Sequence, residues 1–135
     1  MASMTDYMIL HDDAFELSTS PAGPGDVRKL DFSLPANFTI GTRRALPLLA
    51  FIVNPVSDDV ELGFWVNPSD PNLIQTQREQ LLTWPNGPHI DQGLWEGING
   101  QKFNEGQANS IFFRVLRGRV RLRDVVLWYQ RGSGD

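Results

Sequence analysis

The stretch that decides the fold is Gly93–Gln130, which reads GLWEGINGQKFNEGQANSIFFRVLRGRVRLRDVVLWYQ. Two runs of apolar residues, Ile111–Leu116 and Val120–Tyr129, lie within it and are separated only by residues 117–119. Two such runs joined by a short segment that contains glycine are typical of a β-hairpin. We therefore predict a hairpin here, with Gly118 at the turn position that requires a positive φ angle.

The second run repeats with a period of two residues. Val120 and Leu122 point to one side, and three arginines point to the other: Arg119, Arg121 and Arg123. Such alternation is typical of a strand with one buried face and one face in water. From Val125 to Tyr129 both faces are apolar. This indicates that something besides the domain's own core covers one of them.

Turn signals rich in Gly, Pro, Asn and Asp divide the rest of the chain into further short segments. Their residue patterns predict strands at 7–10, 14–18, 27–34, 37–40, 60–66 and 94–98, and a short extended piece at 102–103. The nearly all-apolar segment 45–53 fits a central strand that is buried on both faces. Residues 73–82 fit either two turns of helix or a strand followed by a loop, of which we favour the second. Eight or nine short strands without a strong helix predict an all-β domain, either a two-sheet sandwich or a barrel.

Length and composition narrow the class of protein. The chain has 135 residues, which fits a single domain over 1–135 with frayed ends at 1–6 and 131–135. It contains no cysteine, which excludes disulfide frameworks, thiolate catalysis and cysteine-based zinc sites. The first ten residues lack the pattern of a secretory signal, and no apolar stretch is long enough to span a bilayer. We therefore expect a soluble protein without a membrane partner, and the compartment stays open.

The net charge is −4, but its sign is unevenly distributed. Residues 114–131 contain six arginines and one acid, Asp124. The first 31 residues contain six acidic and two basic residues. An acidic protein is a poor partner for nucleic acid, because phosphate contacts dominate such binding. We expect the arginines to pair with acidic side chains of a neighbouring strand, or to stay solvated, rather than to bind nucleic acid.

The order of features from Leu46 to Gln130 resembles the jelly-roll β-sandwiches of the galactose-binding-like superfamily, which include many carbohydrate-binding modules. The shared features are an apolar strand, a strand that ends in Val-Asn, a strand with tryptophan, a G-x-x-N turn and a closing G-x-V-x-[IL]-x-D-V-x-[LV] pattern. They lie here at 48–53, 64–67, 94–96, 106–111 and 118–127. The resemblance implies a two-sheet antiparallel β-sandwich of jelly-roll type and a noncatalytic binding domain, although fold alone does not establish function.

The loop at 83–92 offers the best candidate ligand site. It contains Trp84, Asn86, His89 and Asp91, and Trp95 follows on the next predicted strand. A sugar ring stacks its C–H groups on a flat aromatic face, and neighbouring amides and carboxylates bind its hydroxyls. We expect these five residues to bind a ligand, with the alternative that Trp84 closes one end of the core. On strands, tryptophans more often pack in a core or on a sheet face, which applies to Trp65, Trp95 and Trp128.

No motif implies a cofactor, but the resemblance raises a structural calcium ion. In carbohydrate-binding jelly rolls an acid of the closing Asp-Val motif often ligates calcium together with N-terminal oxygens. Asp124 matches that position here, with Asp13 as a partner and Asp12 or Glu16 as alternatives. The competing interpretation is that Asp124 pairs with a neighbouring arginine or lies at a β-bulge.

Two functions remain. The first is noncatalytic binding of a carbohydrate or glycan, through the aromatic loop or through the sheet face that carries the arginines. The alternative is a structural or assembly protein that forms a homo-oligomer through its sheet faces. Catalysis is disfavoured, because the two histidines are far apart in sequence and no G-x-S-x-G, Walker or dinucleotide motif occurs.

Overall fold

The computed structural model describes residues 3–19, 26–35, 47–68, 80–86, 89–98, 102–104 and 107–132. This part of the chain contains nine strands and no α-helix. It therefore also holds no helix that could cross a membrane. The strands are β1 (Ser3–His11), β2 (Phe15–Ser18), β3 (Val27–Ser33), β4 (Leu48–Pro55), β5 (Val60–Val66), β6 (Gln80–Trp84), β7 (Gln92–Gly97), β8 (Ala108–Arg117) and β9 (Arg119–Gly132).

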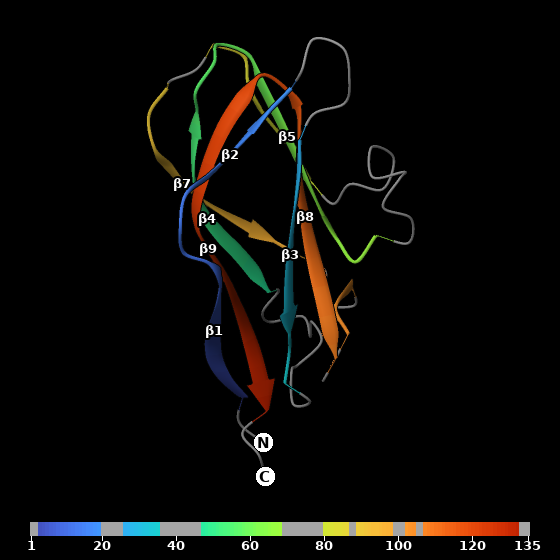
Figure 1. Cartoon of the computed structure of the whole chain (residues 1–135). Helices are drawn as coiled ribbons and strands as arrows, with labels where there is room; N and C mark the ends of the chain where they lie inside the picture. Colours follow the sequence, from blue (N-terminus) through green and yellow to red (C-terminus); the bar gives the residue numbers. More distant parts are fainter. Residues whose placement is uncertain are drawn as a thin grey trace.

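The strands form two antiparallel sheets that face each other as layers (Figure 1). The first sheet has the order β1-β9-β4-β7, and β2 pairs with β9 on the same side as β1. The second sheet has the order β3-β8-β5-β6. Each strand enters the layer opposite to the previous one, except within the pairs β1–β2 and β5–β6, and this is the order of a jelly roll. The predicted fold, an all-β antiparallel sandwich of jelly-roll type with eight or nine strands, is confirmed.

The core lies between the layers and consists of every second side chain of the facing strands. Along β4, Leu49, Phe51 and Val53 are buried, and the residues between them point to the outer face of the first sheet. Phe113 of β8 joins the layers, because its ring centroid lies 5.4 Å from that of Phe51 and 6.2 Å from that of Phe64. The alternation predicted for Val120 and Leu122, both fully buried, is confirmed.

The connection between β8 and β9 is not the hairpin that the sequence predicts. β8 pairs with β3 and β5 in the second sheet, whereas β9 pairs with β1, β2 and β4 in the first. The two strands turn their apolar faces, with Val115 and Val120, toward the shared core. Gly118 has a φ of 79°, as predicted, but it lies at the apex of an arch between the layers.

Three further expectations about strands need correction. Segment 45–53 is not buried on both faces, because Leu48 is 38% exposed and Ala50 and Ile52 are half-buried on the outer face. Trp84 belongs to strand β6 rather than to a loop. Residues 102–103 form no strand. The strand predicted at 37–40 lies outside the described residues, as do 73–79 of the 73–82 segment, whose residues 80–82 belong to β6.

Candidate functional site

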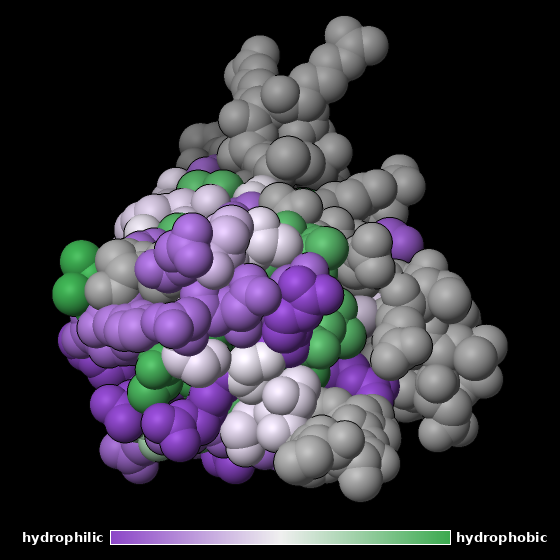
Figure 2. All heavy atoms as spheres, turned by 90° about the horizontal axis from the view of Figure 1, so that it is seen from above, coloured by the Kyte–Doolittle hydropathy of each residue, from purple (hydrophilic) through white to green (hydrophobic). Residues whose placement is uncertain are grey.

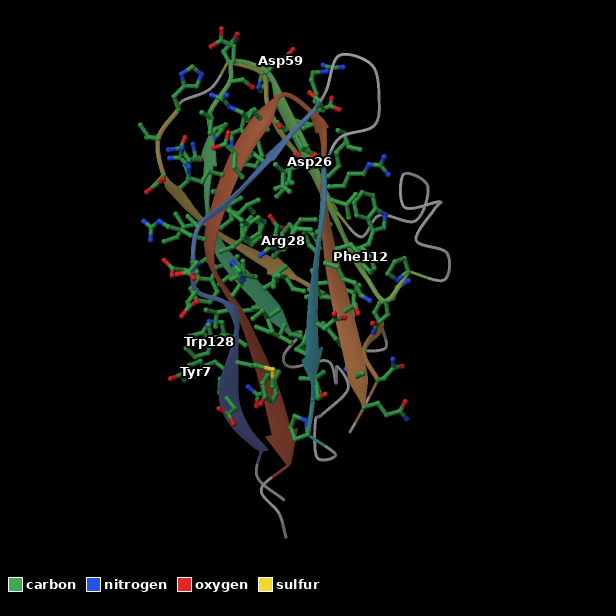
Figure 3. All side chains as sticks on the ribbon, in the orientation of Figure 1. Tyr7, Asp26, Arg28, Asp59, Phe112 and Trp128 are labelled. Atoms are coloured by element: carbon green, nitrogen blue, oxygen red, sulfur yellow. The ribbon has the colours of Figure 1, made fainter. Side chains whose placement is uncertain are left out.

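The outer face of the β1-β9-β4-β7 sheet gathers three aromatic side chains from three strands. Tyr7 of β1 is the register partner of Trp128 of β9, and Trp95 of β7 lies two strands further across the sheet. The ring centroid of Trp128 is 5.1 Å from that of Tyr7 and 6.0 Å from that of Trp95. Figure 3 shows Tyr7 and Trp128 together on this side of the molecule. We call Tyr7, Trp95 and Trp128 the aromatic platform.

The two outer rings of the aromatic platform are open to solvent. Tyr7 is 54% and Trp95 59% exposed, while Trp128 is half-buried between them. The sequence around Trp95 explains its exposure. Its outer-face neighbours along β7 are Gly93 and Gly97, and its register partner on β4 is Ala50. No large side chain therefore stands beside the indole on its own strand or directly opposite it.

Charged side chains occupy the other half of the same face. Arg119 and Arg121 share Glu16 of β2, with nitrogen to oxygen distances of 3.0 and 3.5 Å. Arg123 Nη2 lies 3.0 Å from Asp91 Oδ2. The expectation that the arginines pair with acids of a neighbouring strand is confirmed for Glu16. Each such exposed pair adds at most about 1 kcal/mol to stability, so these pairs order the face more than they stabilise it.

Asp91 is held in its ionised form by this network. Arg123 donates to one carboxylate oxygen of Asp91, and Asn54 Nδ2 donates to the other at 3.2 Å. These two hydrogen bonds, with that of Arg123 first, lower the pKa of Asp91 below its ordinary value, against a small opposing effect of desolvation. Arg123 also donates to the carboxylate of Asp124, and its hydrogen bonds with Asp91 and Asp124 raise the pKa of Arg123.

The structure divides the ligand set predicted from the loop. Trp84 is half-buried and packs against the core, and its Nε1 donates to Gln92 Oε1 at 3.1 Å. This geometry agrees with the alternative in which Trp84 closes one end of the core. His89 is exposed with a φ of 62°, and its Nε2 lies 3.0 Å from Asp58 Oδ1. Asn86 is exposed beyond the end of β6.

Of that set, only two residues lie on the outer face of the first sheet: Trp95, which is part of the aromatic platform, and Asp91, which pairs with Arg123. The end of the sandwich that carries Asp59 presents a mostly hydrophilic described surface, seen from above in Figure 2. The site predicted from the sequence did not include Tyr7 and Trp128. The available signal was the run of apolar residues on both faces of 125–129, but the sequence does not reveal which strands flank it.

Of the residues proposed for calcium, Asp124 has an arginine partner in the described structure. Asp124 has a φ of 53° and lies at the irregularity in the pairing of β9 with β4. Arg123 Nη1 donates to its carboxylate. Asp13 is exposed in the connection between β1 and β2. No group of three or more His, Asp or Glu side chains within the described residues could hold a metal ion.

We expect neither calcium chloride nor a chelator to change the melting temperature, because Arg123 already neutralises Asp124. Thermal unfolding followed by circular dichroism checks this. A ligand that binds only the folded state raises the melting temperature with its concentration. A saturable rise with calcium that is lost in Asp124→Asn would support the calcium interpretation.

Comparisons with known proteins show similarity among solved structures. No protein-family model matches the chain, and no curated protein matches it in sequence. Among solved structures, the chain is similar to the crystal structure of the C-terminal CBM6 of LamC, a marine laminarinase from Zobellia galactanivorans. The two share 8% sequence identity, the match covers 93% of this chain and 99% of that one, and the TM-score is 0.48. At this identity the similarity assigns no role to any residue of this chain.

Proposed function

We propose that this protein is a noncatalytic carbohydrate-binding module that holds its glycan on the aromatic platform. The observation that carries the proposal is Trp95, an indole that is 59% exposed on a rigid strand with glycines on both sides. Aromatic side chains offer large contact areas at a small cost in conformational entropy. The C–H groups of a pyranose supply the complementary apolar face.

Polar groups border the aromatic platform on two sides, as a sugar site requires. On one side Gln130 Nε2 donates to Thr5 Oγ1 at 2.7 Å, next to the pair Tyr7 and Trp128. On the other side lies the Arg123–Asp91 pair, with Asp91 four residues before Trp95 in the chain. Hydroxyl groups along a glycan would meet donors and acceptors at both borders.

The state of Asp91 supports binding without catalysis. A glycosidase of the usual type needs a carboxylic acid with a raised pKa as proton donor, paired with a second carboxylate. The pKa of Asp91 is lowered instead, and Glu16 on the same face is occupied by Arg119 and Arg121. Asp91 therefore suits the role of a hydrogen-bond acceptor better than that of a proton donor.

Removal of the Trp95 ring should abolish most of the affinity. Affinity electrophoresis and calorimetry with neutral polysaccharides (β-glucan, xylan, mannan and galactan) would identify a ligand of the native protein. We expect Trp95→Ala to bind this ligand about 30-fold more weakly, because truncation of an aromatic anchor costs about 2 kcal/mol or more. Trp95→Phe should retain part of the affinity.

Val27→Ala is the matched control, because Val27 is an exposed apolar residue of the other sheet. Its affinity should equal that of the native protein. Absence of binding by the folded native protein to neutral and acidic polysaccharides alike would refute the proposed function.

Self-association through the same face is the second candidate. Ile9 and Leu48 are 58% and 38% exposed beside the aromatic platform, and aliphatic side chains suit a protein partner better than a sugar. If two copies meet there, light scattering will show a closed oligomer that Ile9→Lys converts to a monomer. A monodisperse monomer at high concentration would exclude this candidate.

A further inference from the structure

The outer face has an open position beside Trp95. A Cβ atom added at Gly93 would meet no other atom within 4 Å. Gly93 lies between Asp91 and Trp95 in the chain, on the outer face of the first sheet, and its register partner on β4 is Ile52. We call this open position the Gly93 gap. It lies at the boundary between the aromatic half and the charged half of the face.

Arg123 and Asp91, the hydrogen-bonding groups beside the gap, come from parts of the sheet that are not direct neighbours. Arg123 belongs to β9 and Asp91 immediately precedes β7, and strand β4 runs between them. Their 3.0 Å contact therefore carries the guanidinium across β4, where Asn54 also donates to Asp91. The result is a donor and an acceptor held together on the same face as an exposed indole, with Gly93 between Asp91 and Trp95 along the chain. Because each is fixed by a second partner, little ordering entropy is lost when a ligand binds.

We propose that the Gly93 gap admits the hydroxyl edge of one neutral pyranose whose ring face lies on Trp95, with Asp91 accepting from and Arg123 donating to its hydroxyls. This inference rests on the proposed function and adds the ligand class and the residues that select it. Gly93 acts through the absence of a side chain, which lets a sugar approach the sheet surface.

The charges of this face favour a neutral sugar over an acidic one. The guanidinium of Arg123 contacts two carboxylates, those of Asp91 and Asp124, so it has no excess positive charge to offer. Arg119 and Arg121 likewise share the carboxylate of Glu16. A uronic acid or sulfate group beside Trp95 would also be repelled by the ionised Asp91. Binding should therefore change little with ionic strength, which screens exposed charges.

Gly93→Val tests the gap directly. The site is open and no positive φ is recorded for Gly93, so a β-branched residue should be accepted in β7 with an unchanged or slightly higher melting temperature. We expect affinity for the polysaccharide that binds the native protein to fall at least about tenfold, since lost hydroxyl contacts of this kind cost about 1.4 kcal/mol or more. Gly93→Ala should give an intermediate loss.

Asp91→Asn provides a second test if Gly93→Val fails to fold. It keeps the shape but removes the charge that holds Arg123, and we again expect at least about tenfold weaker binding. The matched control is Asp31→Asn on β3 of the other sheet. Asp31 is also exposed, pairs with Lys29 at 3.4 Å and accepts from Ser110 at 2.6 Å. Its affinity should equal that of the native protein.

The outcomes separate this inference from the proposed function. If the native protein binds a neutral polysaccharide and Trp95→Ala loses it, but Gly93→Val and Asp91→Asn bind like the native protein, the Gly93 gap is not the subsite. If acidic polysaccharides bind more tightly than neutral ones and high salt releases them, the assigned ligand class is wrong. If no polysaccharide binds at all, the proposed function itself is refuted.

Discussion

Replacement of Gly118 by alanine should destabilise the folded protein by about 3 kcal/mol or more. Gly118 has a φ of 79°, where an L-residue is strained by about 1–2 kcal/mol. In addition, the new Cβ would lie 2.1 Å from the carbonyl oxygen of Asp59 and 2.6 Å from Ser57 Oγ. Relief of that overlap requires movement of the arch apex, and overpacking typically costs about 1–3 kcal/mol.

Movement of the arch apex is costly because three segments meet there. Arg119 N donates to Ser57 Oγ at 2.9 Å, and Thr19 N donates to Gly118 O at 3.0 Å. Val56 N also donates to Arg119 O at 2.9 Å. The arch thus joins the β4–β5 turn and the end of β2. Urea denaturation would measure the change in free energy of unfolding.

Gly93→Ala is the matched control for Gly118→Ala. The substitution is chemically identical, but the added Cβ has open space around it. We expect the free energy of unfolding to change by no more than about 0.5 kcal/mol, as is usual for surface positions. Equal stability of the two variants would contradict the arch geometry.

Asn109→Ala should cost about 4 kcal/mol, the largest effect among the polar residues. Asn109 is only 2% exposed, and its side-chain amide makes four hydrogen bonds. Its Oδ1 accepts from Asn67 Nδ2 at 2.8 Å and from Asn104 N at 2.7 Å. Its Nδ2 donates to Asn104 O and to Gln107 O, both at 3.0 Å. Each of the four lost hydrogen bonds contributes about 0.5–1.5 kcal/mol to stability.

Asn104→Ala is the matched control for Asn109→Ala, because it removes an exposed asparagine side chain instead of a buried one. The Asn104 side chain is exposed, and its Nδ2 makes a longer bond of 3.4 Å to Ala108 O. Its backbone contacts with Asn109 survive the substitution, so we expect a loss of less than about 1 kcal/mol. Thermal and urea denaturation of both variants would compare them. Similar losses would show that Asn109 does not organise this end of the sandwich.

Asn67 and Asn109 also explain two features of the sequence, the Val-Asn ending of one strand and the G-x-x-N turn. The Val-Asn ending of β5 places Asn67, with a φ of 44°, where its amide reaches Asn109 and its Oδ1 accepts from Ser110 N at 2.8 Å. The G-x-x-N turn supplies Asn109. Both asparagines were noted as parts of the resemblance to jelly-roll domains. Their side chains form hydrogen bonds with backbone groups of Lys102, Asn104, Gln107 and Ser110 at the start of β8 and in the segment before it.

The candidate site could be predicted only in part. Trp95 and Asp91 were assigned to a ligand site on the basis of the loop before β7, and they lie on one face near the aromatic platform. Trp84 was assigned with them, but half-burial against the core is decided by neighbours from distant parts of the chain. Tyr7 lies 121 positions from its register partner Trp128, and no local pattern links them.

The sequence by itself determined most of the strand segments, though not β6, and the apolar face of strands such as β9, because side chains alternate with a fixed period of two along any strand. It also determined that Gly118 needs a positive φ. Only the tertiary structure decided that β8 and β9 lie in different sheets, and that Tyr7, Trp95 and Trp128 share one outer face. The physical reason is that strand partners are selected by burial of apolar faces across the whole core, a condition that involves residues far apart in the chain.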